Sequence, residues 1–230
     1  MSADVSCKDK VYDSQPVNLA IYFDGIKDKR VLDIGCGAGN LGAALKLQGN
    51  ECYGITLSEN EAALAQSRLS GVVVGDVEAM QALPFPRQFF DVVIFGDVLE
   101  HLRNPQRTLQ LVKPYLKMGA KVIASIPNVA NIEVRWDLLR GHFDYQPTGI
   151  LDNTHLRFYT LGTAKELIAS VGYQVEDVKF THWNWELPRP IQMLLARYEW
   201  EVKTRMARWW PGLFATQFVI YAKHLDGARV

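Results

Sequence analysis

The sequence predicts an α/β fold built on a doubly wound, largely parallel sheet. Short apolar runs bounded by turn residues alternate with stretches of helical periodicity, and no internal repeat or low-complexity tract interrupts them. The composition agrees, because 48% of the 230 residues are hydrophobic and 22% are charged, as in an ordinary globular chain. We therefore expect a single domain over residues 1–230.

Seven apolar runs, each bounded by turn residues, are predicted to form the strands. They are residues 30–34, 51–56, 72–75, 90–95, 121–126, 173–180 and 214–222. Helices are predicted between the first six, with 40–48 and 59–69 following the first two strands. A further helix at 104–116 carries Pro105 in its first turn, where a missing N–H costs nothing. Thr160 is predicted to cap the helix before the sixth strand.

Two long segments, 128–159 and 182–213, interrupt this alternation, and we expect both to be insertions that cover a binding site. The second is predicted to contain an amphipathic helix after Pro190, because apolar residues recur there at helical spacing: Ile191, Leu194, Leu195, Tyr198, Val202, Met206 and Trp209. This helix either packs on its own domain or serves as a lid, a dimer face or a membrane-surface element. Glu199 and Glu201 weigh against the membrane alternative.

Charge and cysteine content exclude several classes of protein. Lys and Arg number 25, as do Asp and Glu, so the chain lacks the basic field of a sequence-independent nucleic-acid binder. No apolar run approaches the ~20 residues of a membrane span, and the N-terminus MSADVSCKDK lacks the apolar core of a signal peptide. Cys7, Cys36 and Cys52 show no zinc-site spacing and cannot all pair. We expect a cytoplasmic protein with reduced thiols and no nucleic-acid partner.

A glycine-rich turn follows the first predicted strand, in the sequence VLDIGCGAGN that ends at Asn40. Gly35, Gly37 and Gly39 let a ligand approach the backbone closely where a helix begins. A dinucleotide fingerprint would place its third glycine at Asn40, so the loop departs from that motif. Asp33 stands two residues before the loop, where it can hold a cationic amino group. This arrangement favours S-adenosylmethionine as the ligand.

The same segment resembles the first motif of class I S-adenosylmethionine-dependent methyltransferases, and three further motifs follow in the family's order. GDVEAM at 75–80 is similar to the acidic loop after the third strand, FFDVVIFGDVLEHL at 89–102 to the fourth-strand motif, and LKMGAKVIASIPN at 116–128 to the fifth. Together they cover about residues 30–180. Residues 125–160 most resemble enzymes of sugar and polysaccharide modification and, more distantly, ubiquinone-pathway O-methyltransferases. The resemblance implies a seven-stranded sheet in the order 3-2-1-4-5-7-6 with the last strand antiparallel.

The resemblance also implies which residues hold the cofactor: Asp33, Gly35, Cys36, Gly37, Gly39, Asp76, Val77, Phe95, Gly96 and Asp97. Asp33 would orient the methionine amino group, and the glycine loop would line the methionine and ribose with its backbone. Asp76 would accept from the adenine amino group while the Val77 N–H meets the ring. The end of the fourth strand would border the sulfonium. Alternatively, Asp33 and Asp76 only cap a helix or form a turn.

The second predicted strand departs from the family pattern. The family usually ends this strand with an acid that grips both ribose hydroxyls, whereas YGITLSENE places Thr56 there. The stretch GITLS resembles cyclopropane-forming lipid methyltransferases, in which a polar side chain on the next helix assists. We therefore expect Glu61 to take over the ribose contact, the alternative being an ordinary surface glutamate.

Two histidines are the candidates for catalysis, because methyl transfer to an alcohol needs a positioned and deprotonated nucleophile. His101 follows the strand that borders the cofactor, and His155 lies in a segment predicted to cover it. Either could instead be structural. Asp97 and Glu100 are one helical turn apart, and with the two histidines they resemble the metal site of small-RNA terminal 2′-O-methyltransferases and of some ubiquinone-pathway O-methyltransferases. A divalent ion is thus the alternative to a histidine base, although many relatives carry DVLEH without a metal.

We expect an enzyme that transfers a methyl group from S-adenosylmethionine to an oxygen of a sugar-like or other small hydroxylated acceptor, a small molecule or a glycan. The alternatives are a natural-product or quinone-pathway phenol, a nitrogen acceptor, or, in another class, a cofactor-binding scaffold or partner subunit without turnover. Candidates for stacking on the acceptor are Trp136, Phe143, Tyr145, Phe158, Trp183 and Trp185. Arg135, Arg140 and Arg157 are candidates for pairing with a phosphate or carboxylate on it. A homodimer is compatible with the sequence.

Overall fold

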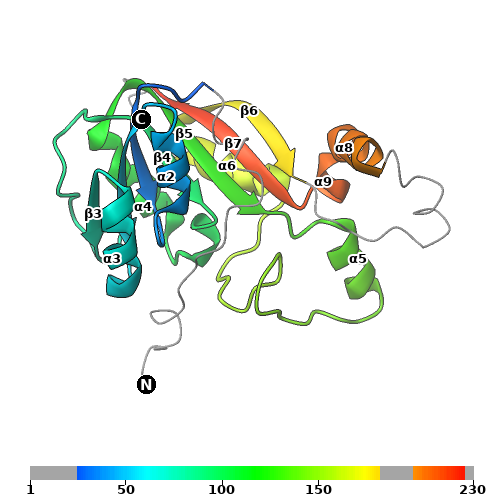
Figure 1. Ribbon diagram of the computed structural model, residues 1–230. Helices are drawn as coiled ribbons and strands as arrows, with labels where there is room; N and C mark the ends of the chain where they lie inside the picture. Colours follow the sequence, from blue (N-terminus) through cyan, green and yellow to red (C-terminus); the bar gives the residue numbers. More distant parts are fainter. Residues whose placement is uncertain (1–24, 182–198, 226–230) are drawn as a thin grey trace.

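The computed structural model describes residues 25–181 and 199–225, and its centre is a seven-stranded sheet (Figure 1). The strands in chain order are β1 (Arg30–Ile34), β2 (Glu51–Thr56), β3 (Gly71–Val74), β4 (Phe90–Gly96), β5 (Leu116–Pro127), β6 (Tyr173–Thr181) and β7 (Gln217–His224). Their order across the sheet is β3-β2-β1-β4-β5-β7-β6. The first five strands pair in parallel, whereas β7 runs antiparallel to both β5 and β6. The predicted fold class, strand order and orientation are confirmed.

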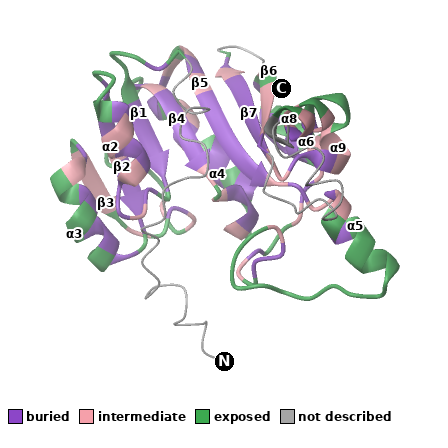
Figure 2. Cartoon of the chain, turned by 45° about the vertical axis from the view of Figure 1, so that its right-hand side comes forward, coloured by how far each residue is buried: buried purple, intermediate pink, exposed green. Residues whose placement is uncertain are grey.

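The central strands bury side chains on both faces of the sheet, as Figure 2 shows by the colour of β1, β4 and β5. Val31 belongs to one apolar cluster and its neighbour Leu32 to the other. Ile94 and Phe95 divide in the same way. Alternate residues of a strand point to opposite faces, so these near-continuous apolar runs build two cores, as expected of a parallel sheet covered on both sides.

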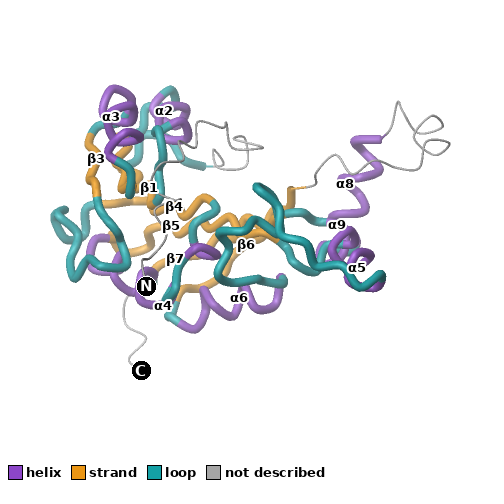
Figure 3. The backbone as a smooth tube through the Cα atoms, turned by 90° about the horizontal axis from the view of Figure 1, so that it is seen from below, coloured by secondary structure: helices purple, strands orange, loops and turns teal. Residues whose placement is uncertain are grey.

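Helices cover both faces of the sheet (Figure 3). They include α2 (Asn40–Lys46), α3 (Glu59–Arg68), α4 (Pro105–Val112) and α6 (Leu161–Ser170). Leu45 of α2 and Ala65 of α3 join the cluster that contains Val31. Leu109 of α4 and Ile168 of α6 join the opposite cluster. The helices α2 and α3 thus cover one face of the sheet, and α4 and α6 cover the other. The carboxyl ends of β1, β2 and β4 lie together at one edge between these two layers.

Several element ends differ from the predicted ones, mainly where a proline stands. The helix predicted over 104–116 ends as α4 at Val112, and a 3-10 turn at Lys113–Tyr115 contains Pro114, which lacks the N–H that a longer α-helix would use. The seventh strand begins at Gln217 and not at residue 214, because the preceding residues form the short helix α9 (Pro211–Phe214). β5 is longer than predicted.

Two connections also differ from the predicted alternation. No helix separates β3 from β4, because residues 75–89 form only turns, and Pro84 and Pro86 lack backbone donors there. Conversely, the segment predicted as an insertion over 128–159 contains the helix α5 (Ile132–Leu139). The Asn131 side chain caps this helix by accepting from the Glu133 N–H at 3.0 Å.

The helix α8 (Glu199–Trp209) lies in the second long segment, but its buried face is not the predicted one. Lys203 and Ala207 are buried, whereas Val202 and Met206 are half-buried and Trp209 is 80% exposed. The remaining members of the predicted stripe, Ile191, Leu194, Leu195 and Tyr198, lie outside the described residues. Across residues 25–181 and 199–225, every helix falls short of the length and apolar character of a membrane span.

Candidate active site

The glycine loop occupies the edge formed by the carboxyl ends of β1, β2 and β4, where parallel sheets bind ligands. Gly35 and Gly39 have φ angles of 75° and 79°. A Cβ on Gly35 would lie 2.5 Å from Val98 Cγ2, so no side chain fits there. The N–H groups of Gly35 and Cys36 donate to the Ile55 carbonyl at 2.8 and 3.0 Å. Both N–H groups are therefore occupied, so these two residues could meet a ligand only by close approach and not by donating to it.

Asp33 is buried in β1, where it pairs in register with Gly54 of β2 and Ile94 of β4. Burial raises the pKa of this carboxyl to about 7. A cationic group placed beside it would favour the ionised form and reverse part of this shift. Asp33 is therefore suited to receive an ammonium group.

Thr56 and Glu61 form a buried pair at the end of β2. The Thr56 hydroxyl donates to Glu61 Oε2 at 2.8 Å, and the side chains are 3% and 6% exposed. Ser58 caps α3 by accepting from the Glu61 N–H at 3.3 Å. Burial raises the pKa of the Cys36 thiol, and the charges of Asp33 and Glu61 add to the effect, so both carboxylates lie near the glycine loop. The alternative of a surface glutamate at position 61 is wrong.

Asp76 and Val77 follow β3, as expected of the loop that would meet adenine. Asp76 Oδ1 accepts from the Glu78 N–H at 2.8 Å and closes a turn. Turn formation was the structural alternative to an adenine contact at this residue. The side chain is nevertheless exposed at the surface of the loop, whereas Val77 is buried in the core. The turn and an adenine contact are compatible, because Oδ2 of Asp76 has no partner among the described residues.

Phe95 and Asp97, two of the residues expected to border the cofactor at the end of β4, differ in their surroundings. Phe95 is fully buried, so its ring belongs to the core and only its backbone can border a ligand. Asp97 has a left-handed φ of 54°, a conformation that is costly for a residue other than glycine and clusters at functional sites. Its Oδ1 accepts from Ser125 Oγ and from Gln217 Nε2, each at 2.7 Å. Sequence reasoning missed Ser125, near the end of β5 beside β4, and Gln217, at the start of β7 one strand further along the sheet.

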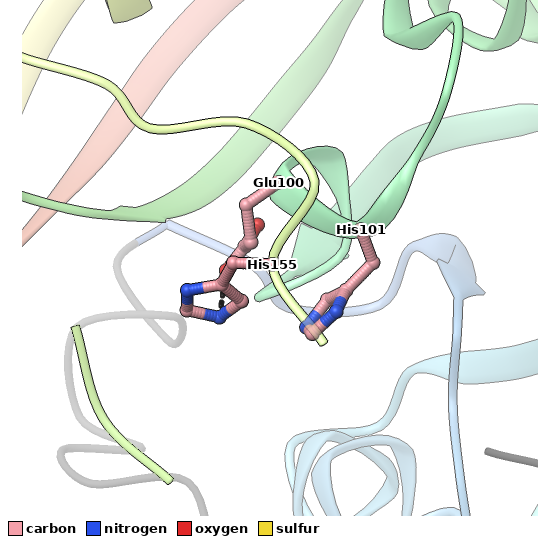
Figure 4. A group of neighbouring side chains, drawn as sticks. All are labelled: Glu100, His101 and His155. Atoms are coloured by element: carbon pink, nitrogen blue, oxygen red, sulfur yellow. Dashed lines mark ion pairs between the residues drawn. The ribbon is translucent and has the colours of Figure 1, made fainter. Parts of the chain in front are cut away.

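Glu100, His101 and His155 converge beside the short turn Leu99–His101, as Figure 4 shows. Their nitrogen and oxygen atoms that could bind a metal lie within 4.8 Å of one another. His155 Nε2 is 3.9 Å from Glu100 Oε1, and the two imidazole rings are in edge contact with centroids 4.8 Å apart. The backbone N–H groups of Leu156 and Arg157 donate to the Glu100 carbonyl at 2.9 and 3.0 Å. The structure thus brings both candidate histidines to one place.

Hydrogen bonds to backbone carbonyls define the tautomers of both rings. His155 Nδ1 is 3.0 Å from the Ile150 carbonyl, which can only accept, so Nδ1 carries the proton and Nε2 presents its lone pair toward Glu100. His101 Nδ1 is 3.2 Å from both the carbonyl and the hydroxyl oxygen of Thr154. Its Nε2 is then the basic atom and has no partner among the described residues.

The Glu100 carboxyl is the most unusual group of the site. It is 1% exposed, and neither oxygen has a hydrogen-bond partner within the described part of the chain. Burial raises its pKa well above the usual range, and the charge of Asp97 adds to this. Burial also lowers the pKa of His155, as does the neighbouring His101. Burial therefore favours the neutral form of both Glu100 and His155.

The residues expected to hold a metal fit that role in part. Asp97 lies outside the converging group, because its Oδ1 is bound by Ser125 and Gln217, so the expected set of four is reduced to three. One carboxylate and two imidazoles form a donor set that divalent ions accept, and the unpartnered oxygens of Glu100 fit a ligand role. Glu100, His101 and His155 would hold such an ion, which would supply Lewis-acid polarisation of an acceptor oxygen.

Two of the arginines expected to pair with an anionic acceptor are used within the protein. Arg135 Nε donates to the Ala130 carbonyl at 2.7 Å, and Arg157 donates to the carbonyls of Leu102 and Arg103. Arg140 lines a hollow of about 400 Å³ between α5 and the loop that follows it. Three carboxylates share that lining: Glu133, Asp137 and Asp144. The hollow therefore does not favour an anionic ligand.

Aromatic rings link this loop to the histidines. Phe143 makes edge contacts with Tyr145 and Phe158, with ring centroids 5.7 and 5.6 Å apart, and Phe158 lies 6.3 Å from the His155 ring. Phe143 and Tyr145 are also exposed, so they offer ring surface to an acceptor. Trp136 is exposed on α5, whereas the candidates Trp183 and Trp185 lie outside the described residues.

Known proteins resemble the chain in both sequence and fold. The ubiquinone biosynthesis O-methyltransferase of Azoarcus sp. (strain BH72) is 34% identical over 164 residues, which are 64% of this chain and 69% of that protein. A SAM-dependent methyltransferase from Archaeoglobus fulgidus matches the structure with a TM-score of 0.59 at 20% identity, over 89% of each chain. The [4+2]-cyclase SpnF matches with a TM-score of 0.60 at 18% identity, over 91% of this chain and 79% of that one.

The fold, the motifs and these relatives together define a class I S-adenosylmethionine-dependent methyltransferase. S-adenosylmethionine is accordingly its cofactor. Within this class, the chain belongs to the family described as methionine biosynthesis protein MetW, whose sequence profile matches residues 20–204.

Proposed function

We propose that the protein methylates a hydroxyl oxygen of a small phenolic molecule, with His101 as the base. The convergence of Glu100, His101 and His155 at the end of β4 is the observation that carries the proposal. Bound S-adenosylmethionine supplies an electrophilic methyl group, whose transfer to the acceptor oxygen leaves S-adenosylhomocysteine. Asp33 would hold the methionine ammonium, the Thr56–Glu61 pair the ribose, and the Asp76–Val77 loop the adenine.

His101 is better suited than His155 to take the acceptor proton. Its Nε2 carries a free lone pair, and its Nδ1–H is held by Thr154, so the ring is oriented and ready to accept. The lone pair of His155 faces Glu100 instead. In the proposed step the acceptor O–H proton moves to His101 Nε2 as the oxygen–methyl bond forms. His155 and Glu100 then keep the imidazole in place and exclude water from it.

A phenol suits this site better than a sugar nucleotide. A phenol with a pKa near 10 is far easier for an imidazole to deprotonate than an alkyl alcohol. Arg135 and Arg157 are bound to backbone carbonyls, so they do not offer free guanidinium groups to a phosphate. Exposed Phe143 and Tyr145 offer stacking surface, and the relatives named for ubiquinone biosynthesis point to the same class. The segments 128–159 and 182–213 would form the acceptor cover in a cytoplasmic enzyme.

A methyl-transfer assay with labelled S-adenosylmethionine tests the proposal. We expect transfer to catechols and other phenols, and none to glucose, glycans or UDP-glucose. His101→Gln should reduce turnover at least about 100-fold, the lower range for a general base, while S-adenosylhomocysteine still binds. Transfer to sugars or amines in preference to phenols would overturn the acceptor assignment.

A cofactor-binding scaffold is the competing function. The fold alone does not specify methyl transfer, because a [4+2]-cyclase shares this architecture. The fold is therefore compatible with a scaffold. It predicts S-adenosylhomocysteine binding without transfer to any acceptor of the panel, together with capture of a partner chain or formation of a homodimer. Calorimetry and sedimentation measured beside the transfer assay therefore separate the two.

A further inference from the structure

Glu78 joins the loop expected to meet adenine to the segment that carries the catalytic histidine. Its Oε2 accepts from the Arg103 N–H at 3.0 Å, and its Oε1 accepts from the Asn104 N–H at 2.7 Å. Asn104 is the N-cap of α4, where the helix dipole favours a negative charge. Two charge-assisted bonds from one carboxylate form a short and directional link.

Arg107 strengthens this link from the first turns of α4. Its guanidinium donates to the carbonyl of Glu78 and, at 3.1 Å, to that of Met80. The loop at 76–80 and the start of α4 are thus connected at several points, although nearly thirty positions separate them in the chain. We expect them to move as one unit.

The opposite side of the same segment is bound to the loop that carries His155. Arg157 donates to the carbonyls of Leu102 and Arg103, the latter being the residue whose N–H binds Glu78. The Leu156 and Arg157 N–H groups also donate to the Glu100 carbonyl. Residues 99–104 are therefore hydrogen-bonded to two loops that are distant in the sequence. One loop is expected to meet the cofactor, and the other is expected to meet the acceptor.

We propose that Glu78 is a positioning residue that couples occupancy of the adenine side to the placement of His101 and His155. The inference rests on the proposed function, in which Asp76 and Val77 hold adenine. A ligand that orders the loop at 76–78 restrains residues 103 and 104 through Glu78, and Arg157 passes this restraint to the His155 loop. The catalytic pair is thereby ordered when the cofactor is bound, which fits an ordered addition of cofactor before acceptor.

Hydrogen exchange of the full chain, with and without S-adenosylhomocysteine, tests the coupling. In the unaltered protein the ligand should slow exchange about tenfold in both 99–104 and 154–157, a factor usual for coupled sites. Glu78→Gln keeps the shape but loses the charge and one acceptor. It should retain ligand binding by calorimetry yet lose the protection at 154–157. Glu176→Gln, an exposed carboxylate on β6, is the matched control and should behave as the unaltered protein.

A second variant tests the direction of the coupling. Arg157→Lys removes the planar fork that reaches Leu102 and Arg103 but keeps the backbone bonds to Glu100, so ligand protection should persist at 99–104 and weaken at 154–157. Full protection of 154–157 in Glu78→Gln would overturn the inference and leave Glu78 as a helix cap, visible only as a lower melting temperature. Ligand binding without protection in the unaltered protein would also overturn it. Absence of ligand binding would instead refute the proposed function, and this inference with it.

Discussion

The Thr56 hydroxyl donates to Glu61 Oε2 at 2.8 Å, so β2 and α3 share one buried polar pair at the edge of the site. β2 itself ends without a carboxylate. The following helix, α3, supplies a carboxylate close to the end of β2. Ser58 caps this helix, and Glu61 therefore lies in its first turn. The Glu61 carboxylate can accept hydrogen bonds from the two ribose hydroxyls only if it stays oriented. The hydrogen bond from the Thr56 hydroxyl orients it.

Glu61→Gln is expected to weaken S-adenosylhomocysteine binding by roughly 1.5 to 3 kcal/mol, the value of a hydrogen bond to a charged group. Calorimetry measures it, with the melting temperature of the free protein as a check on folding. Glu59→Gln is the matched control, since Glu59 is exposed in the same turn of α3. Equal affinity in both variants would contradict the ribose assignment.

Cofactor affinity is expected to depend on pH through Asp33. With a pKa of about 7 in the free protein, Asp33 must lose a proton before it can pair with an ammonium group. The dissociation constant of S-adenosylhomocysteine should therefore rise roughly 25-fold between pH 7.5 and 5.5 if this one group controls it. Asp33→Asn should bind weakly and without this slope. An unchanged slope in that variant would assign the pH dependence to another group.

The same raised pKa predicts the pH dependence of folding in the free protein. Between about pH 4 and pH 7 the folded chain keeps a proton on Asp33 that the unfolded chain has lost, so the free energy of unfolding falls as pH rises. Denaturant titrations at several pH values measure this trend. Asp33→Asn should flatten it.

A chelator is expected to leave methyl transfer unchanged, because the proposed base is His101 without an ion. Glu100→Gln should then be tolerated, since burial favours the neutral form of this carboxyl, whereas His101→Gln should lower turnover strongly. Loss of activity with EDTA and rescue by Mg²⁺ or Mn²⁺ would show that Glu100, His101 and His155 bind a metal. Glu100→Gln would in that case weaken the ion's affinity.

Gly35→Ala is expected to destabilise the protein by roughly 2 to 4 kcal/mol, from the left-handed φ and the clash with Val98. Val98→Ala in the same chain should relieve the clash and regain that part of the stability, but it should not relieve the backbone strain at position 35. A double-mutant cycle by denaturant unfolding measures the difference. Simple additivity of the two substitutions would argue against this contact.

The sheet could be predicted from the sequence because its signals are local and repeated. Each strand is a short apolar run between turn residues, and the glycine loop locates the ligand edge through Gly35 and Gly39 alone. The order of the last two strands required the family resemblance, since no local feature of 173–180 or 214–222 specifies their exchange.

The candidate site was less accessible to such reasoning, because its contacts join distant segments. That Glu61 is buried against Thr56 depends on how α3 packs, and the polar partners of Asp97 come from β5 and β7. The carboxylate link from Glu78 spans two loops whose proximity only the fold creates. In the described part of the predicted apolar stripe, Trp209 is exposed and Val202 and Met206 are only half-buried, whereas α8 buries the neighbouring Lys203 and Ala207.

The strand β7, the last described strand in chain order, lies inside the sheet between β5 and β6. Its first residue, Gln217, donates a hydrogen bond to Asp97. During synthesis, the glycine loop and the histidines leave the ribosome long before this residue does. The nascent chain therefore holds β5 with an open edge, and an Asp97 side chain with only one of its two partners, until β7 inserts. A ribosome-stalled chain ending before residue 217 should expose this edge to chaperones, whereas one that includes β7 should be protected.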